Sequence, residues 1–419
     1  MLSFNPLKSH IMHIDLNSCF ATVEQQANPL LRGKPIVVAA YASPKGCILA
    51  SSVEAKRFGI KTGMSVKEGK LRYPKLIVLS PDPWKYRSVH LRLRKLLSSY
   101  TPFVQPRSID EFVLDLTNTP SLKTKSMQEV GLEIKVRIKK EIGDFLTVSI
   151  GISTNRFLAK LASNLQKPDG LIEINGQNFK KHYATIKPTD LPYIKQRNAF
   201  RLASVGIFTV IDFYNSPLWK LKVAFASINS YYWHMRLRGY EVDAVSWGRR
   251  SYGNSYALPQ PLATVKELMP ILTKLTTKMM GRVRSAGYKA RGVHLSLFYR
   301  DGSFWHKGES FSHFLFDTRD ILKIFRSLLT TSYLVGQKPK PIRNIAVSCF
   351  NLTKTKLIQL SFFEDINSKV LLNSHVDSAN KKWGEFVVIP ASMMATAQYV
   401  PDRIAFGGVK ELEEFTLGA

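Results

Sequence analysis

Three acidic side chains, Asp15, Asp110 and Glu111, stand at the ends of short apolar segments. Asp15 closes the segment HIMHID, and the Asp110–Glu111 pair follows about 95 residues later, in a tight connection between two apolar runs. Carboxylate oxygens are hard ligands of the kind that Mg²⁺ prefers, and we expect the carbonyl of Leu16 to add another. Two such ions about 4 Å apart neutralise a phosphate and activate an attacking hydroxyl, so the three acids suit phosphoryl or nucleotidyl transfer.

The pattern around the acids predicts elements that bring them together. Apolar periodicity predicts, in order, a strand, a helix, two strands, a helix and a strand at His10–Asp15, Ser18–Ala27, Phe103–Arg107, Phe112–Leu116, Met127–Ile142 and Thr147–Ser153. This order is the ferredoxin-like (split βαβ) arrangement, a four-stranded antiparallel sheet backed by two helices. The first strand then ends beside the hairpin of the second and third. Each acid alone would usually be a turn former or a solvated residue, but together in this order they favour a metal site.

The composition restricts the class of partner. The chain has 60 Lys+Arg against 31 Asp+Glu, a formal net charge of +29, which indicates a polyanionic partner. Nucleic acid is favoured over an acidic membrane, because no basic amphipathic helix stands out. The three cysteines are too scattered for a disulfide framework or a zinc site. With no signal peptide or membrane span, we expect a cytoplasmic protein.

Four motifs then resemble one family. They are HIDLNSCFATVEQQANPLLRGKPIVVA, GCILASSVEAKRFGIKTGM, SIDEFVLDL and GISTNRFLAKLASNLQKPDG. In this order and spacing they are similar to the Y-family DNA polymerases, the translesion enzymes that include bacterial DNA polymerase IV. The resemblance runs from about residue 10 to about residue 350. It implies that Asp15, Asp110 and Glu111 are the family's metal ligands.

The resemblance also implies an α+β multidomain fold, a right-hand polymerase with a split βαβ palm. The expected parts are a palm (1–26 and 84–175), small fingers (27–83), a helical thumb (176–243), a linker (244–254), an α+β little finger (255–352) and a C-terminal extension (353–419). The segment 244–254 is polar and basic, which is typical of a linker. We expect a monomer that binds primer-template DNA and deoxynucleotides.

Four residues are candidates for binding the incoming nucleotide. Phe20 matches the family's steric gate, where an aromatic ring would collide with a 2′-hydroxyl and so exclude ribonucleotides. Lys160 matches a lysine that touches the triphosphate as a point charge. Ala50 and Lys56 lie where many relatives grip the triphosphate, but Val53 and Lys56 replace their tyrosine and arginine. Because lysine cannot make the bidentate contact of a guanidinium, we expect weaker nucleotide binding.

Three small residues match positions that roof the nascent base pair: Ala40, Cys47 and Gly63. Little bulk above the template base admits a swollen adduct and gives up geometric checking of the pair. The resemblance therefore implies lesion tolerance with low fidelity. No segment resembles a proofreading exonuclease.

Basic residues outside the first 170 are candidates for DNA contacts. The segment Leu191–Phe213 resembles the thumb hairpin, although Tyr193 and Lys195 replace glycines that commonly approach a phosphate with their amides. Side chains of Lys195 and Arg197 could bind phosphate instead. The further candidates, which would position DNA without reading sequence, are Arg249, Arg250, Arg282, Arg284, Lys289 and Arg291.

A pentapeptide near the end resembles the segment with which bacterial polymerases bind the sliding clamp. It reads Gln359-Leu360-Ser361-Phe362-Phe363. Gln359 would anchor by hydrogen bonds, and Leu360, Phe362 and Phe363 would fill an apolar pocket. The alternative is an ordinary strand of a small C-terminal extension.

Two other functions stay open at this point. The first is a catalytically silent relative that acts as a DNA- or clamp-binding scaffold, against which the three retained carboxylates argue. The second is a nucleotide cyclase, which shares the palm topology but not the thumb, the basic module or the clamp-like peptide. The sequence therefore predicts a low-fidelity DNA polymerase that uses two Mg²⁺ ions.

Overall fold

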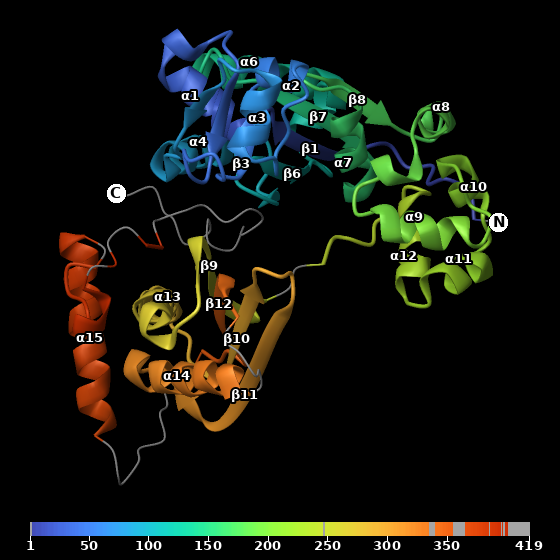
Figure 1. Ribbon diagram of the computed structural model, residues 1–419. Helices are drawn as coiled ribbons and strands as arrows, with labels where there is room; N and C mark the ends of the chain where they lie inside the picture. The colour runs from blue at the N-terminus through green and yellow to red at the C-terminus, as the bar shows by residue number, and fades with distance from the viewer. Residues whose placement is uncertain are drawn as a thin grey trace. The chain divides into compact units, whose positions relative to one another are not determined.

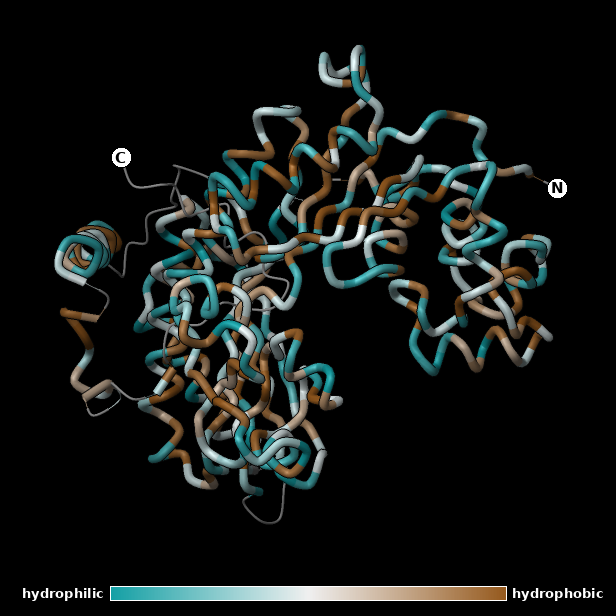
Figure 2. Tube along the Cα trace, turned by 90° about the horizontal axis from the view of Figure 1, so that it is seen from above, coloured by the Kyte–Doolittle hydropathy of each residue, from teal (hydrophilic) through white to brown (hydrophobic). Residues whose placement is uncertain are grey.

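The computed structural model describes residues 2–245, 248–334, 340–354, 365–384, 386–394, 396 and 399–400. These residues form two compact units, which divide between residues 245 and 248 (Figure 1). No described helix is both long enough and apolar enough to cross a membrane. Figure 2 shows hydrophobic stretches interrupted by hydrophilic residues in both units.

The first unit is built around a five-stranded sheet in the order β5-β6-β1-β7-β8. Its strands are β1 (Ile11–Leu16), β5 (Val104–Pro106), β6 (Glu111–Asp115), β7 (Val148–Ser153) and β8 (Leu171–Ile174). As predicted, β1 lies between β6 and β7 and is antiparallel to both. The prediction of four antiparallel strands is wrong, because β8 adds a fifth strand that is parallel to β7. β8 gives no clear pattern, since only Ile174 in it is buried.

Helices cover both faces of this sheet. α4 (Pro83–Leu97) and α6 (Met127–Glu141) pack on one face and share a core with β1, β6 and β7. α7 (Arg156–Leu165) packs on the other face, against β7, β1 and β8. β1 and β7 are consequently buried at every residue. Two further helices are α1 (Cys19–Ala27) and α5 (Ser121–Thr124).

A smaller sheet is formed by the segment between α1 and α4. Its strands, in the order β3-β2-β4, are β2 (Ile36–Ala39), β3 (Ile48–Ser51) and β4 (Ile77–Leu79). Its helices are η1 (Pro29–Leu31), α2 (Val53–Arg57) and α3 (Val66–Arg72). The sheet has its own core, separate from that of the five-stranded sheet. Side chains of Ser52 and Ser65 cap α2 and α3, so both helices begin where the sequence provides an N-cap.

A helical region follows β8. It comprises α8 (Phe179–Thr185), η2 (Pro188–Asp190), α9 (Gln196–Ala203), α10 (Val210–Asn215), α11 (Leu218–Phe225) and α12 (Asn229–Arg236). These helices share an aromatic-rich core with one side of α7. α7 therefore links the helical region to the five-stranded sheet.

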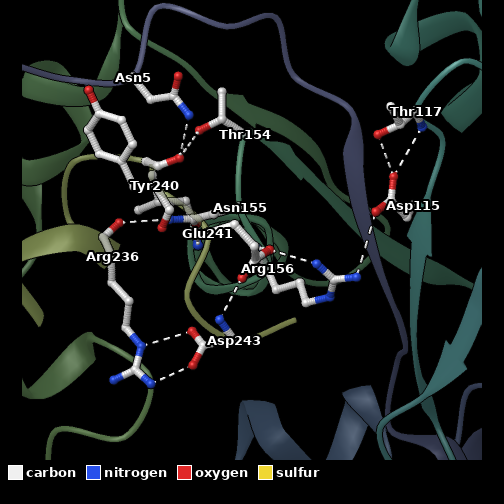
Figure 3. A network of polar contacts seen from close by, with 12 residues as sticks. Asn5, Asp115, Thr117, Thr154, Asn155, Arg156, Arg236, Tyr240, Glu241 and Asp243 are labelled. Carbon is white, nitrogen blue, oxygen red and sulfur yellow. Dashed lines mark hydrogen bonds and ion pairs between the residues drawn. The ribbon is translucent and has the colours of Figure 1, made fainter. Parts of the chain in front are cut away.

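Residues from the N-terminal segment, the β7–α7 connection and the start of α7 bind the segment that follows α12 (Figure 3). The side chains of Asn5 and Thr154 both donate to the carbonyl of Gly239, at 3.0 and 2.8 Å. The guanidinium of Arg156, whose side chain is 9% exposed, donates to the carboxylate of Glu241 at 2.8 Å. This junction holds the helical region firmly against the sheet.

The second unit is an antiparallel sheet with helices on one face. The strands, in the order β11-β10-β12-β9, are β9 (Ser251–Leu262), β10 (Ala290–Tyr299), β11 (Phe304–Leu315) and β12 (Ile342–Phe350). The helices are α13 (Val265–Ser285), α14 (Thr318–Leu334), α15 (Ile366–Trp383) and η3 (Ala391–Met393). The predicted linker 244–254 ends too late, because β9 begins at Ser251. Tyr252, buried among apolar residues, draws this polar stretch into the sheet.

Candidate active site

The three predicted carboxylates meet at one end of the five-stranded sheet. Asp15 and Glu111 are direct cross-strand partners in the register of β1 and β6. Asp110 immediately precedes β6, and its carbonyl accepts a hydrogen bond from the amide of Leu16 at 2.9 Å. The Asp110 carboxylate accepts from the Ser108 hydroxyl at 2.5 Å. Residues about 95 positions apart thus form one acidic cluster.

Two lysines neutralise the cluster. The Lys160 ammonium lies 2.6 Å from Glu111 Oε2, and the Lys167 ammonium lies 2.6 Å from Asp15 Oδ2. Lys160 is a predicted site residue, whereas Lys167 is one that sequence reasoning missed. Its signal was present, because Lys167 is the second lysine of the same motif, seven residues after Lys160.

Burial disfavours negative charge on two of the acids. Desolvation raises the pKa of Asp15 to about 6, although Lys167 opposes the shift and the other two carboxylates add to it. Desolvation also raises the pKa of Asp110, with Glu111 contributing in the same direction. Carboxylates held close together, two of them desolvated, are stabilised by a divalent cation, which binds the ionised form. The donor set therefore fits Mg²⁺, with Asp15, Asp110 and Glu111 as the residues that would hold it.

A cavity of about 580 Å³ opens beside Asp15 and Asp110, whereas Glu111 and Lys160 are not among its lining residues. That volume is in the range of small-molecule sites. Its lining includes five predicted site residues in addition to Leu16, namely Asp15, Phe20, Ala50, Lys56 and Asp110. It also includes three residues that sequence reasoning missed, namely Arg57, Thr62 and Lys167. Arg57 had one signal, its position next to Lys56 in the helix predicted to face the triphosphate.

The predicted gate residue is held by stacking. The Phe20 ring stacks on Tyr86 with 4.2 Å between centroids and 13° between planes. The Tyr86 hydroxyl donates to the buried carboxylate of Glu24 at 2.8 Å, and Lys85 binds the same carboxylate at 2.9 Å. Phe20 therefore lines the cavity at a position set by a second aromatic ring.

The three predicted roof residues lie together at one end of the small sheet. The Ala40 amide donates to the Cys47 carbonyl at 2.8 Å, and the Gly63 amide donates to the carbonyl of Ile48 at 2.9 Å. Gly63 has a positive φ of 92°, which favours glycine, and a Cβ there would meet no atom within 4 Å. Cys47 is exposed. The surface at this end carries little side-chain bulk.

The sequence of the chain matches known proteins. Residues 14–164 match the model of the impB/mucB/samB family, and residues 249–362 match the model of that family's C-terminal domain. The chain is 31% identical over 386 residues to DNA polymerase IV of Moorella thermoacetica, covering 90% of this chain and 94% of the relative. It is 30% identical over 390 residues to DNA polymerase IV 1 of Bacillus subtilis, covering 90% and 92%. The chain belongs to the Y-family of DNA polymerases.

Solved structures support the same fold. A Y-family DNA polymerase chimera of Dbh and Dpo4 superposes with a TM-score of 0.73 at 24% identity, covering 82% of this chain and 99% of that one. An insertion ternary complex of Dbh DNA polymerase superposes with a TM-score of 0.56 at 24% identity, with the same coverage. The mixed α+β multidomain fold predicted from the sequence is therefore confirmed for this Y-family member.

At the hairpin predicted for Leu191–Phe213, the backbone has a conformation that favours glycine although the residue is not glycine. Tyr193, in place of a glycine, has a positive φ of 69°, a conformation that costs an L-residue about 1–2 kcal/mol. Its ring lies 6.0 Å from the Lys160 ammonium. Lys195 is the N-cap residue of α9 and Arg197 lies in its first turn, and both are exposed. Their side chains are accessible to a phosphate.

The basic candidates of the second unit fall into two groups. Arg250 and Arg291 are exposed, while Arg249, Arg282 and Lys289 are partly buried. The Arg249 guanidinium lies 3.6 Å from the Tyr252 ring centroid, and Arg291 lies 4.2 Å from the Phe314 centroid.

Arg284 is occupied inside the second unit, which argues against its predicted role as a phosphate contact. Its guanidinium makes two hydrogen bonds with Asp377 of α15, at 2.6 and 2.8 Å. It also donates to the Phe316 carbonyl at 3.1 Å and to the Thr318 hydroxyl at 2.9 Å. Arg284 therefore anchors α15 to the rest of the unit.

The predicted clamp peptide, Gln359, Leu360, Phe362 and Phe363, lies outside the described residues.

Proposed function

We propose that this Y-family DNA polymerase joins deoxynucleotides to a primer end by two-metal-ion transfer, and that it continues opposite and past damaged template bases. The observation that carries the proposal is the convergence of three carboxylates, two of which, Asp15 and Asp110, line a cavity of about 580 Å³, while Glu111 is the cross-strand partner of Asp15. Bound by these carboxylates and the Leu16 carbonyl, two Mg²⁺ would activate the primer hydroxyl and neutralise the leaving pyrophosphate.

The chain's own residues would bind and orient the nucleotide. With a cation at the carboxylates, Lys160 and Lys167 would be released from Glu111 and Asp15 to bind triphosphate oxygens. Lys56, whose ammonium lies 2.7 Å from the Ser18 hydroxyl, would add a further positive charge on the cavity wall. Phe20 would lie beneath the sugar, where its ring excludes a 2′-hydroxyl. Burial lowers the pKa of Lys56, so a triphosphate would also stabilise its charged form.

We assign domains as the sequence predicts, with one change. Residues 1–26 and 84–175 would be the palm, 27–83 the fingers and 176–243 the thumb. The little finger would begin at Ser251, since β9 belongs to its sheet. Residues 353–419 would be a C-terminal extension that contributes α15 to the second unit.

We expect low fidelity because the residues proposed to lie above the nascent base pair are small. Ala40, Cys47 and Gly63 put little bulk above the template base, so the site would exert weak steric selection on the base pair. Basic side chains would hold the duplex through its phosphates. They are Lys195, Arg197, Arg249, Arg250, Arg282, Lys289 and Arg291. Such contacts would make DNA binding weaken as salt rises.

The residue types of Gln359–Phe363 support a sliding-clamp contact. Deleting these residues should reduce the length of product made with a clamp loaded on DNA, but not extension of a bare primer. An equal loss in both assays would contradict clamp binding.

Primer extension with Mg²⁺ tests the whole proposal. On undamaged and lesion-bearing templates, the wild-type protein should extend both, and chelation of Mg²⁺ should stop it. A wild-type protein that binds primer-template but extends neither would favour the scaffold alternative.

A further inference from the structure

His13 is a buried polar residue of the five-stranded sheet, and its ring lacks a hydrogen-bond partner in the part of the chain that the structure describes. It lies on β1, two residues before Asp15, and is 1% exposed. Neither ring nitrogen has a hydrogen-bond partner among the described residues. Such orphaned buried groups are rare, because desolvation of a polar atom goes uncompensated.

The residues paired with His13 on the neighbouring strands offer no polar side chain. Its cross-strand neighbours are Val113 on β6 and Gly151 on β7. α7 approaches closely, since a Cβ on Gly151 would lie only 1.9 Å from the carbonyl oxygen of Ala159. An aliphatic residue would fill this space without leaving polar atoms unpaired. A histidine at this position needs a hydrogen-bond partner, which no described residue supplies at hydrogen-bond distance.

The carboxylate of Glu111 lies where it could become the hydrogen-bond partner of His13. His13 Nε2 lies 3.7 Å from Glu111 Oε2, roughly 0.5–1 Å beyond hydrogen-bond reach. The same oxygen is taken by Lys160 at 2.6 Å. Ligand atoms of His13, Asp15 and Glu111 all lie within 4.8 Å of one another. A small rotation of the Glu111 side chain would close the gap to His13.

We propose that His13 is a positioning residue that donates its Nε2–H to the Glu111 carboxylate once Lys160 has turned to the triphosphate. This inference rests on the proposed function, because it assigns Glu111 as a metal ligand. Carboxylate ligands are oriented by hydrogen bonds from residues behind them, and losing such a bond typically weakens metal binding. A hydrogen-bond role suits the site better than direct ligation, since Mg²⁺ prefers oxygen donors.

Two variants at His13 separate the hydrogen bond from packing. His13→Gln keeps an amide donor near the place of Nε2, whereas His13→Leu keeps comparable bulk without a donor. Ile11→Val, on the same face of β1 but further from Asp15, is the matched packing control. The probe is Mn²⁺, measured by electron paramagnetic resonance, on the full chain bound to a dideoxy-terminated primer-template and the correct deoxynucleotide.

His13→Leu should weaken Mn²⁺ binding by about 10–100-fold, while His13→Gln and Ile11→Val should stay within about threefold of wild type. Without metal, His13→Leu should melt at the same temperature as wild type or higher, because it removes unpaired polar atoms. Wild-type affinity in His13→Leu, or equal loss in His13→Gln and His13→Leu, would overturn the proposal. So would a nitrogen coupling of directly bound imidazole in the Mn²⁺ spectrum.

Glu111→Ala distinguishes this failure from failure of the proposed function. If Glu111→Ala binds Mn²⁺ as tightly as wild type does, the carboxylate metal site itself is refuted, and the His13 inference with it. If Glu111→Ala loses Mn²⁺ but His13→Leu does not, only the inference about His13 fails.

Discussion

The two large sheets of the molecule both pack against helices, but they differ in how many of their faces the helices cover. The five-stranded sheet has α4 and α6 on one face and α7 on the other, so β1 and β7 are buried at every residue. In the four-stranded sheet the helical core lies on one face, and buried and exposed residues alternate along β9. One sheet removes side chains from water on both faces, and the other on one.

The difference explains what each sheet suits. Double coverage desolvates Asp15 and raises its pKa to about 6, which prepares the carboxylates for a cation. Single coverage leaves side chains on the other face of the sheet exposed or only partly buried. An accessible surface with basic residues at its margins suits a phosphate backbone, as proposed for Arg250 and Arg291.

The strongest test of this contrast removes a carboxylate from the doubly covered sheet. Asp110→Ala or Glu111→Ala should reduce primer extension by more than about 100-fold, because loss of a ligand exceeds the usual cost of losing its supporting hydrogen bond. DNA binding, measured by fluorescence anisotropy, should change little. Extension at a wild-type rate in either variant would remove the acids from catalysis.

Substitution of Phe20 tests whether a side chain of the cavity wall selects deoxyribose over ribose. Phe20→Ala should raise incorporation of ribonucleotides relative to deoxynucleotides by roughly 10–200-fold, because it removes the steric block. Tyr86→Leu should raise it less, since Phe20 remains but loses the stacking ring 4.2 Å away. The ratio of kcat/KM values for matched nucleotides measures both effects. Unchanged exclusion of ribonucleotides in Phe20→Ala would assign the gate elsewhere.

Burial of Asp15 predicts a pH effect in the metal-free protein. The folded pKa is about 6 and the ordinary value is 3.8, so between pH 7 and 4 the folded state gains a proton that the unfolded state lacks. The contribution of Asp15 to the free energy of unfolding should therefore rise by about 2 kcal/mol as the pH falls through this range. Because other carboxylates titrate here too, the quantity to measure is the difference between wild type and Asp15→Asn. A difference that is flat from pH 7 to 4 would contradict the desolvation.

The smallest effects should come from the singly covered sheet and its flank. Arg291→Ala should weaken primer-template binding several-fold and lower the salt slope by about 1, as loss of one phosphate contact does. Arg284→Ala should leave that slope unchanged but lower the melting temperature of the second unit, because it breaks the pair with Asp377. Equal salt slopes for Arg291→Ala and wild type would exclude Arg291 from the phosphate contacts.

The sequence predicted the elements with strong periodicity. β1, β6, β7 and α6 lie where apolar spacing indicates, because burial of one stripe or alternate face leaves a local pattern. β8 was missed because three of its residues are only partly buried. The start of β9 was missed because polar residues surround Tyr252, whose burial depends on pairing with β12, about 100 residues away.

The roles of some residues of the candidate site could not be predicted from periodic patterns in the sequence. Lys167 and His13 carry no periodic signal, and each acquires its meaning from a residue distant in sequence, Asp15 and Glu111 respectively. Arg284 looked like Arg291 in the sequence, and only Asp377 of α15 distinguishes them. Contacts of this kind depend on how elements pack.

The amino-acid sequence alone determined the family and the basic excess, and it predicted the three acids as metal ligands and Phe20 as the steric gate, since these inferences depend on residue types and spacing. Only the tertiary structure decided which cations neutralise which carboxylates, which arginine is already engaged, and that His13 is buried beside Glu111 with no hydrogen bond to any described residue. The physical reason is that charge and hydrogen-bonding capacity belong to each residue, whereas desolvation and pairing arise from neighbours that the folded chain brings together.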